Sequence, residues 1–303
     1  MTITRRKALG KPKHHAIRRT RGDVVFDVIN VFVVALITLT MIYPMWYIII
    51  VSIATPEEAA LGGIYLWPET ISFEAYQNVF KNQDIWLSYA NTVLYTVAHT
   101  IYVLLLTIPA AYTLSKKQLP GRVVIPWYFF ITMFLSYILN RNLGLVNSRW
   151  IMILGMGIGY SNLIITRTYF QTSIPNELQE AAYIDGCNNI RFFLRIVLPN
   201  ATTIIAVIGL FYAVDHWLSY WNAMLYITDE TRYPLQLVLR NILIINQSQA
   251  NMLGNNETVI RAMRLTNLLK YVVIIVSTVP ILCAYPFVQK YFNQGFMLGA
   301  VKG

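Results

Sequence analysis

The sequence predicts an all-α membrane protein with six transmembrane helices. Apolar residues make up 56% of its 303 residues and charged residues 13%, and the mean hydropathy is +0.49. An ordinary soluble domain is less apolar than this. The apolar runs are continuous over about twenty residues and show no two-residue alternation, which favours membrane-spanning helices over a β-barrel.

Positive charge is concentrated where a membrane protein usually faces the cytoplasm. The net charge is +10, and much of the excess lies in residues 1–22, with the rest at short loops between apolar runs. This is the positive-inside pattern rather than a nucleic-acid-binding patch, so no nucleic acid is expected as a partner. We therefore expect residues 1–22 to form a basic cytoplasmic tail and both termini to lie in the cytoplasm.

Six apolar runs are expected to cross the lipid bilayer, within one transmembrane domain of residues 23–303. The first run is much longer than the core of a signal peptide, so we interpret it as a retained span. The acidic segment 54–84 and the polar segment 228–266 are expected outside or partly embedded, and the basic turn 115–122 inside. The spans are expected at about 24–52, 85–114, 123–139, 150–170, 200–226 and 267–288.

The segment 171–199 is polar and patterned, unlike the apolar runs on either side of it. Pro175 suits the first turn of a helix, where its missing N–H costs nothing. Gly186 is expected to end that helix, because a helix C-terminus often uses a left-handed residue without a Cβ. A second short helix is expected from Asn188 to Val197, ended by Leu198-Pro199.

The spacing of certain residues in this segment matches a known motif. It reproduces EAA-x3-G-x9-I-x-LP and resembles the EAA loop of binding-protein-dependent ABC importer permeases at every fixed position. The alternative is an amphipathic connector that packs only on its own bundle. The matching residues are Glu180, Ala181, Ala182, Gly186, Ile196, Leu198 and Pro199.

The resemblance extends from Asp23 to Gly303 and is closest to carbohydrate-uptake permeases of the maltose-transporter type. Within these, the chain is similar to the branch that imports oligosaccharides released from complex polysaccharides. The stretch between Phe134 and Leu143 is shorter than is usual in that branch, and Cys187 stands where a small residue is more usual. The closer similarity is carried by NTVLYTV (91–97), NLIITRTYF (162–170), FYAVDHWLSYWNAMLY (211–226), YPLQLVLR (233–240) and LGAVKG (298–303).

The resemblance implies the type I ABC importer permease fold in a bacterial cytoplasmic membrane, with a cytoplasmic EAA loop that docks into an ATPase subunit by helix-in-groove recognition. It implies coupling roles for the motif residues and Asp185, and for Lys302 in a tail that reaches the same interface. The implied partners are a second permease in a heterodimer, two ATPase subunits, an extracellular solute-binding lipoprotein and an oligosaccharide. No cofactor is expected on this chain, since ATP and Mg would bind the ATPase subunits.

A polar and aromatic cluster near the end of the fifth expected span is the candidate translocation path. Ionisable residues inside spans are costly and usually face a cavity, a partner or a pathway, and aromatic faces suit a sugar ring. The alternative is that the aromatic residues mark the membrane interface and Asp215 pairs with the partner permease. The cluster comprises Asp215, His216, Trp217, Tyr220, Trp221 and Asn222.

Other motifs are given structural interpretations. His99 is expected to pack or to hydrogen-bond between helices. The run Gly155-x-Gly157-x-Gly159 lacks the spacing of a dinucleotide fingerprint and is expected to allow close helix packing. The two cysteines indicate neither a disulfide framework nor a metal site. No Walker A loop, HExxH motif or nucleophile elbow occurs, so the chain is not expected to be an enzyme.

These observations favour a permease subunit of an ATP-driven oligosaccharide importer. An importer for another solute, such as a polyol phosphate, and a passive or ion-coupled transporter remain alternatives. An intramembrane enzyme is disfavoured, because Asp215 and His216 are adjacent on a helix and point about 100° apart.

Overall fold

The computed structural model describes residues 21–64, 66–116, 118–155, 157–250 and 257–300. Within these residues the secondary structure is helical, and the only β-pairing is an isolated bridge between Ala54 and Ile71. The predicted all-α fold is confirmed. Two compact units are distinguished, residues 1–47 and 48–303. The predicted basic tail, apart from its last two residues, and Lys302 lie outside the described residues.

Helix α1 (Arg21–Ser52) supplies all of the described structure of the first unit, and its last turn belongs to the second. It covers the expected first span. From Val24 to Met45 its large apolar side chains are exposed on every side. A helix that is apolar all round suits a lipid or partner-subunit environment.

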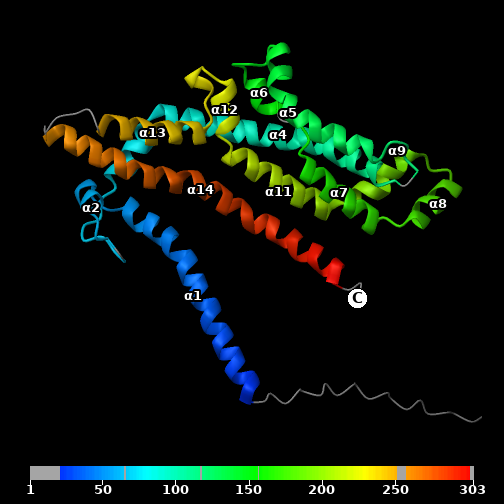
Figure 1. Ribbon diagram of the computed structural model, residues 1–303, viewed down its shortest axis with the longest axis horizontal. Coiled ribbons are helices and arrows are strands. Elements are labelled where there is room, and N and C mark those ends of the chain that lie inside the picture. Colours follow the sequence, from blue (N-terminus) through cyan, green and yellow to red (C-terminus); the bar gives the residue numbers. More distant parts are fainter. Residues whose placement is uncertain (1–20, 65, 117, 156, 251–256, 301–303) are drawn as a thin grey trace, which may run out of the picture. The chain divides into compact units, whose positions relative to one another are not determined.

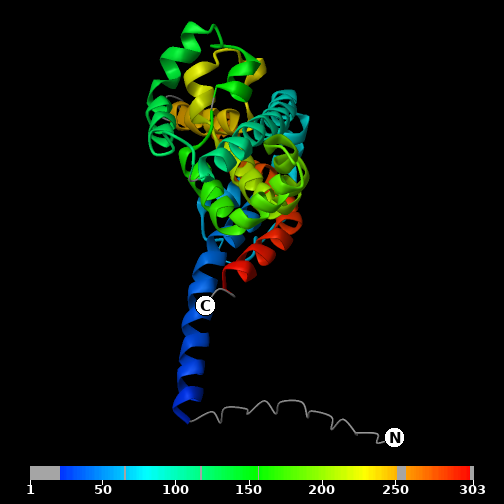
Figure 2. The ribbon, with the colours of Figure 1, turned by 90° about the vertical axis from the view of Figure 1, so that its right-hand side faces the viewer.

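The second unit is a helical bundle organised around α4 (Gln83–Ser115). Helices α7 and α11 pack along α4, and α14 packs against α11 and α13 (Figure 1). Viewed near their ends, these helices form a bundle without any sheet (Figure 2). The remaining bounds are α2 Pro56–Leu61, α3 Glu74–Lys81, α5 Val124–Asn142, α6 Arg149–Leu154, α7 Tyr160–Ser173, α11 Thr202–Leu218, α12 Trp221–Tyr226, η2 Glu230–Arg232, α13 Leu235–Ala250 and α14 Glu257–Ala300.

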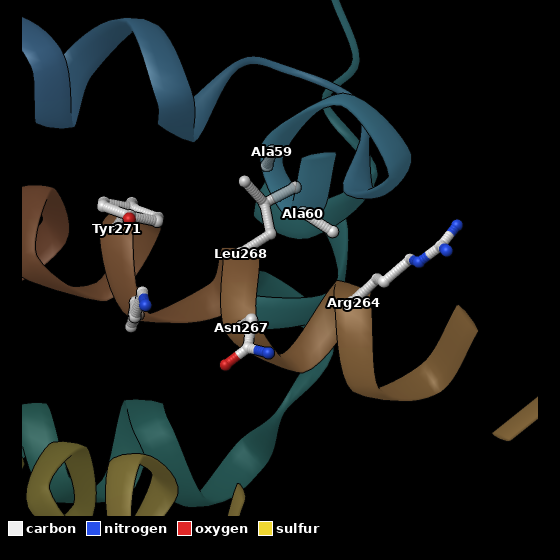
Figure 3. Close-up of a pocket in the computed structure, with 7 residues that line it drawn as sticks. Ala59, Ala60, Arg264, Asn267, Leu268 and Tyr271 are labelled. Carbon is white, nitrogen blue, oxygen red and sulfur yellow. The ribbon is translucent and has the colours of Figure 1, made fainter. Parts of the chain in front are cut away.

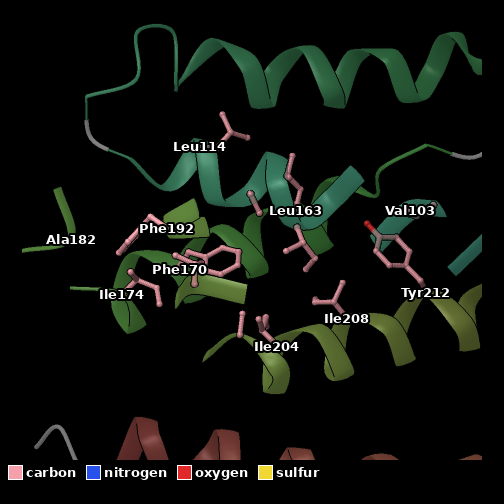
Figure 4. Close-up of a cluster of buried hydrophobic side chains, with 14 residues drawn as sticks. Val103, Leu114, Leu163, Phe170, Ile174, Ala182, Phe192, Ile204, Ile208 and Tyr212 are labelled. Atoms are coloured by element: carbon pink, nitrogen blue, oxygen red, sulfur yellow. The ribbon is translucent and has the colours of Figure 1, made fainter. Parts of the chain in front are cut away.

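The larger apolar core lies where the C-terminal half of α4 meets α7 and α11 (Figure 4). Leu163 and Phe170 on α7 and Ile208 on α11 are almost completely buried in it. Apolar side chains gain little by leaving lipid tails for a protein core, so close packing of this kind is what holds such helices together.

Two of the expected spans are broken in the structure. The run 150–170 forms α6 and α7, interrupted between Leu154 and Tyr160, and the run 200–226 forms α11 and α12, interrupted at Ser219 and Tyr220. By length and apolar composition, α1, α4 and Met263–Cys283 of α14 are long enough to cross a membrane. The bent pair Asn189–Asn200 and Thr202–Leu218 would count as a fourth span.

The polar segment 228–266 is more helical than the sequence suggested. It contains η2 and α13, and α14 begins at Glu257, well before the expected start at 267. Leu235, Leu237 and Leu239 of α13 are buried. Pro234 precedes this helix and fits its start, a signal that the many polar residues nearby concealed.

Candidate functional site

The EAA loop (residues 171–199) starts in the last turn of α7 and continues with α8 (Asn176–Ile184), which Pro175 precedes and Gly186 follows. Gly186 has φ +77° and its N–H donates to the Tyr183 carbonyl at 3.0 Å, while the Cys187 N–H donates to the Ala182 carbonyl at 2.9 Å. These two bonds form a Schellman motif, which satisfies the last carbonyls of the helix. The predicted stop at Gly186 is confirmed.

The second part of the loop is a continuous helical run that includes a π turn. Asn188 caps α9 (Asn189–Phe192) by accepting from the Arg191 N–H at 2.8 Å. The π turn (Phe193–Val197) and α10 (Leu198–Asn200) follow. Pro199 cannot donate and its ring crowds the carbonyl four residues back, so a widened turn before it relieves the conflict. The predicted end at Leu198-Pro199 is therefore moved to Asn200.

Part of the EAA loop packs into the apolar core. Phe192 is fully buried and Ala182 is 7% exposed, and both belong to the core cluster (Figure 4). Ile196 and Leu198 are half-buried against the same cluster. The sequence prediction missed Phe192, although its spacing of four from Ile196 places both side chains on one helical face. These residues hold the loop onto the bundle.

Another part of the loop faces outward. Among the predicted coupling residues, Glu180, Ala181, Asp185, Gly186 and Pro199 are exposed. Ile184 is 87% exposed and Ile190 on α9 is 71% exposed, and neither was predicted. A large exposed apolar side chain beside small and charged residues is typical of a protein–protein contact surface.

Lys116 joins the end of α4 to the EAA loop. Its Nζ donates to the Gln179 Oε1 on α8 and lies 4.6 Å from the Tyr112 ring centroid and 5.9 Å from that of Phe192. Burial lowers the pKa of Lys116 from its usual range. The basic turn at 115–122 was the only sequence signal for this contact.

The predicted translocation cluster is divided between two surroundings. His216 and Trp217 are buried, and they donate to the Met152 carbonyl at 2.7 Å and the Ser277 carbonyl at 3.0 Å. Those two residues therefore join α11 to α6 and α14. Asp215, Tyr220 and Trp221 are exposed, and the Asn222 amide donates to Ser219 Oγ at 3.1 Å. A role of the six residues in translocation stays a prediction.

Two further residues, Arg240 and His99, make contacts near this cluster. The Arg240 guanidinium on α13 lies 5.6 Å from the Tyr220 ring centroid, a cation–π contact that the sequence did not predict. His99 forms the interhelical hydrogen bond that was expected of it. Its Nδ1–H on α4 donates to the Ile153 carbonyl on α6 at 2.9 Å.

A separate hollow of about 250 Å³ lies between α2 and α14 (Figure 3). Its lining includes none of the predicted site residues. It is formed by Ala59, Ala60, Arg264, Asn267, Leu268, Lys270 and Tyr271. Across the part of the chain that the structure describes, no group of three His, Cys, Asp or Glu residues is placed to hold a metal ion.

Most of the chain matches a known protein family. Residues 85–297 match the family described as binding-protein-dependent transport system inner membrane component. The chain belongs to this family. The permease is thus an inner-membrane transport subunit and not an enzyme. A system of this kind in general also includes a partner permease, an ATPase and a solute-binding protein.

Similar proteins cover almost the whole permease. Protein LplC of Bacillus subtilis (strain 168) is 37% identical, with 95% of this chain and 99% of that protein covered. The polygalacturonan/rhamnogalacturonan transport system permease protein YtcP of the same organism is 36% identical, with 92% and 99% covered.

A solved structure is also similar. It is the crystal structure of a bacterial ABC transporter involved in the import of the acidic polysaccharide alginate, with a TM-score of 0.77 and 31% identity over 91% of this chain and all of that chain. The permease therefore has the ABC importer permease fold.

Proposed function

We propose that the permease carries an oligosaccharide across the cytoplasmic membrane, after an extracellular solute-binding lipoprotein has delivered it. It would form a heterodimer with a second permease and work with two ATPase subunits, which bind ATP and Mg. The named substrates of two similar proteins, polygalacturonan/rhamnogalacturonan and alginate, support an oligosaccharide derived from a complex polysaccharide.

The observation that carries this proposal is the division of the EAA loop into a buried face and an exposed face. Ala182 and Phe192 fix the loop to the core, while Glu180 and Ala181 on α8 and Asp185 just after it are exposed. Residues 181 and 185 lie one helical turn apart, so the small Ala181 lets a partner approach closely beside a negative charge. Such a helix fits a groove on an ATPase subunit.

The fixed ends of α8 make it a suitable lever. The Schellman hydrogen bonds at Gly186 fix the C-terminus of α8. The Gln179 side chain on α8 accepts a hydrogen bond from Lys116 at the end of α4. A push on α8 therefore reaches α4 and α7, and through α9 and α10 it also reaches α11, which is bent by 76° from Asn189–Asn200. ATP binding would shift the bundle between inward- and outward-open packings by binding one of them better.

The proposed topology is six spans with both termini on the same side of the membrane as the EAA loop. The basic residues of 1–22 and of the turn 115–122 support this side as the cytoplasmic one. Single cysteines at Ala181 and Thr228, in a chain lacking Cys187 and Cys283, test it with a membrane-impermeant thiol reagent. Labelling of Thr228→Cys, but not Ala181→Cys, from outside intact cells is expected, and the reverse pattern contradicts the topology.

The function is tested by the ATPase activity of the reconstituted complex with its binding protein and a panel of neutral oligosaccharides, acidic oligosaccharides and a polyol phosphate. An oligosaccharide is expected to stimulate hydrolysis. Glu180→Lys should reduce that stimulation about tenfold, the size of one lost contact in an interface hot spot. The matched control Glu230→Lys, an exposed charge reversal in η2, should change it less than about twofold.

Three results would contradict the proposal. Full stimulation in the assembled Glu180→Lys complex would remove the EAA loop from coupling. Sugar uptake that persists without any ATPase subunit would favour a passive or ion-coupled transporter, and stimulation by the polyol phosphate alone would change the substrate class.

A further inference from the structure

Specific side chains hydrogen-bond to the backbone at the interruption between α6 and α7. A helix end leaves its last carbonyls without intrahelical N–H partners. In a membrane domain, where water does not supply the missing bonds, other groups of the protein must do so. This interruption divides a run of residues whose composition suggested a single span.

Three side chains from three different helices bind the carbonyls at the end of α6. His216 Nε2 on α11 lies 2.7 Å from the Met152 carbonyl, and His99 Nδ1 on α4 lies 2.9 Å from the Ile153 carbonyl. Because a carbonyl only accepts, each of these nitrogens carries a hydrogen. Asn140 on α5 donates to the Gly155 carbonyl at 3.1 Å.

These capping side chains are deeply buried. His99 and His216 are each 4% exposed and Asn140 is 5% exposed. The two imidazole rings lie 4.5 Å apart between centroids, so they also pack on each other. Buried polar groups are costly unless they are paired, and each of these three side chains donates to a carbonyl, while the other ring nitrogen of His216, Nδ1, is buried without a hydrogen-bond partner.

The start of α7 is held in a comparable way. The Gly159 N–H donates to the Tyr212 hydroxyl on α11 at 3.1 Å, and that hydroxyl lies 3.0 Å from Thr107 Oγ1 on α4. Tyr212 is 5% exposed and Thr107 is fully buried. The same two helices, α4 and α11, therefore bind both sides of the interruption.

The glycines at the interruption are not there to make room for a neighbouring helix. A Cβ at Gly157 would meet nothing within 4 Å, and a Cβ at Gly159 would meet its nearest neighbour, Tyr212, at an ordinary 3.5 Å. The expectation of close helix packing is thus wrong for these two positions. Alanine at these two positions would favour a continuous helix more than glycine does.

We propose that the interruption is a hinge of the transport cycle, with His99, His216 and Asn140 as positioning residues. The proposal rests on the proposed function of the EAA loop. Helix α7 runs directly from the hinge into the EAA loop, so movement of the loop turns α7 about this point. The capping side chains hold the end of α6 in place during that movement and keep its carbonyls satisfied.

A distance measurement on the native hinge tests the proposal directly. Spin labels at Trp150→Cys on α6 and Gln171→Cys on α7, both exposed positions, are placed in the full complex lacking Cys187 and Cys283. The distance distribution between them should differ between the nucleotide-free and the ATP-bound states. An identical distribution in both states, while ATP-driven transport proceeds, would overturn the hinge without affecting the proposed function.

Variants of the hinge then connect movement to transport. Gly157→Ala with Gly159→Ala fits the observed space, and the complex should assemble and still hydrolyse ATP with loaded binding protein. The amount of sugar transported per ATP should fall about tenfold, because alanine at both positions favours a continuous helix over the interruption. A native ratio of transport to hydrolysis in this variant would contradict the proposal.

The caps are tested by a matched pair at one position. His216→Leu removes the donor, and His216→Gln keeps an N–H group that can reach a carbonyl. The leucine variant should lose transport per ATP about fivefold, while the glutamine variant should stay within about twofold of native. Equal losses in both variants would show that only the shape of the imidazole matters and would overturn its role as a cap.

Discussion

The two ends of α4 are stabilised in different ways. At its C-terminal end the EAA loop packs through the apolar side chain of Phe192 into the core that contains Phe170 of α7, while the motif residues Glu180 and Asp185 are exposed. At its N-terminal end the α5–α6 connection meets the segment after α12 through polar contacts centred on Asn147. We refer to Asn91, Asn147, Asp229, Thr231 and Arg232 as the Asn147 network.

The Asn147 network satisfies its backbone with its own side chains. Asn147 has φ +55°, its N–H donates to the Tyr226 carbonyl at 2.7 Å, and its Oδ1 accepts from the N–H groups of Thr228 and Asp229 at 3.1 and 3.0 Å. Arg232 pairs with Asp229 at 3.0 Å and also donates to the Asn147 carbonyl.

The network is also tied to α4, because Asn91 donates to the carbonyls of Thr231 and Tyr233 at 2.9 and 3.2 Å. The polar groups at the N-terminal end of α4 thus bind mainly one another. The other end keeps charged and apolar side chains available to a partner. Substitutions should therefore affect stability at the Asn147 network, but should separate stability from coupling at the EAA loop.

The largest effect is expected from Phe192→Ala. Phe192 is fully buried, so the substitution leaves a cavity that costs about 3–5 kcal/mol of unfolding free energy. Thermal unfolding of the purified complex measures this. The matched control Ile190→Ala on the same helix, 71% exposed, should leave stability within about 0.5 kcal/mol. It should nevertheless weaken sugar-stimulated ATPase activity, and equal stability losses in both would contradict the assignment of faces.

The adjacent alanines of the motif give a sharper comparison. Ala182→Leu overpacks the core and should lower stability by about 1–3 kcal/mol. Ala181→Leu adds the same atoms to an exposed position, so stability should be unchanged while stimulated ATPase activity falls. Thermal unfolding and hydrolysis are measured on both variants. A stable Ala182→Leu variant together with a fully stimulated Ala181→Leu variant would mean that neither face has the proposed role.

A smaller effect is expected at the Asn147 network. Asn147→Ala removes the amide that accepts two backbone N–H groups and places alanine in a left-handed conformation, at a cost of about 1–2 kcal/mol. Asn147→Gly loses the amide but keeps the backbone freedom, so it should be less destabilising. Thermal unfolding ranks the three proteins. If glycine destabilises as much as alanine, the left-handed backbone contributes nothing measurable.

The smallest effect is a dependence on pH at Asp229. Its carboxylate accepts from the Thr231 hydroxyl and N–H and lies beside Arg232, and these contacts lower its pKa from the usual value. Because the pKa of Asp229 is lower in the folded than in the unfolded protein, its carboxylate stabilises the fold at pH values above the unfolded-state pKa. This stabilisation is lost as the pH falls through the folded-state pKa. Melting curves of native and Asp229→Asn proteins should therefore keep a constant gap from about pH 7 to 5 and converge below about pH 4. A gap that does not change with pH would exclude this contribution.

The features predicted correctly from the sequence are the local ones. The stop at Gly186 follows from the chemistry of a single residue, and α1 and α4 follow from uninterrupted apolar composition. The EAA loop was recognised because its spacing is contained within a few helical turns. Its buried anchor, Phe192, was missed because only contact with α4 and α7 distinguishes it from Phe193.

The features that were missed depend on residues distant in the sequence. The interruption after Leu154 is stabilised by His99 and His216, which lie more than fifty residues away along the chain. No pattern within 150–170 specifies those partners, and the three glycines there were interpreted as a site of close helix packing. The hydrogen bond from His216 to the Met152 carbonyl was likewise missed, because Met152 lies on another helix.

Cross-linking between the permease and its ATPase subunit tests the central claim most directly. In a chain lacking Cys187 and Cys283, single cysteines at Ala181 on the exposed face of α8 and at Thr228 beside the Asn147 network are treated with a short bifunctional thiol reagent in the assembled complex. We expect Ala181→Cys to cross-link to an ATPase subunit carrying a cysteine in its docking groove, and Thr228→Cys to give no such product. A product from Thr228→Cys alone, or from neither position in a complex that transports sugar, would contradict the assignment of the EAA loop as the coupling surface.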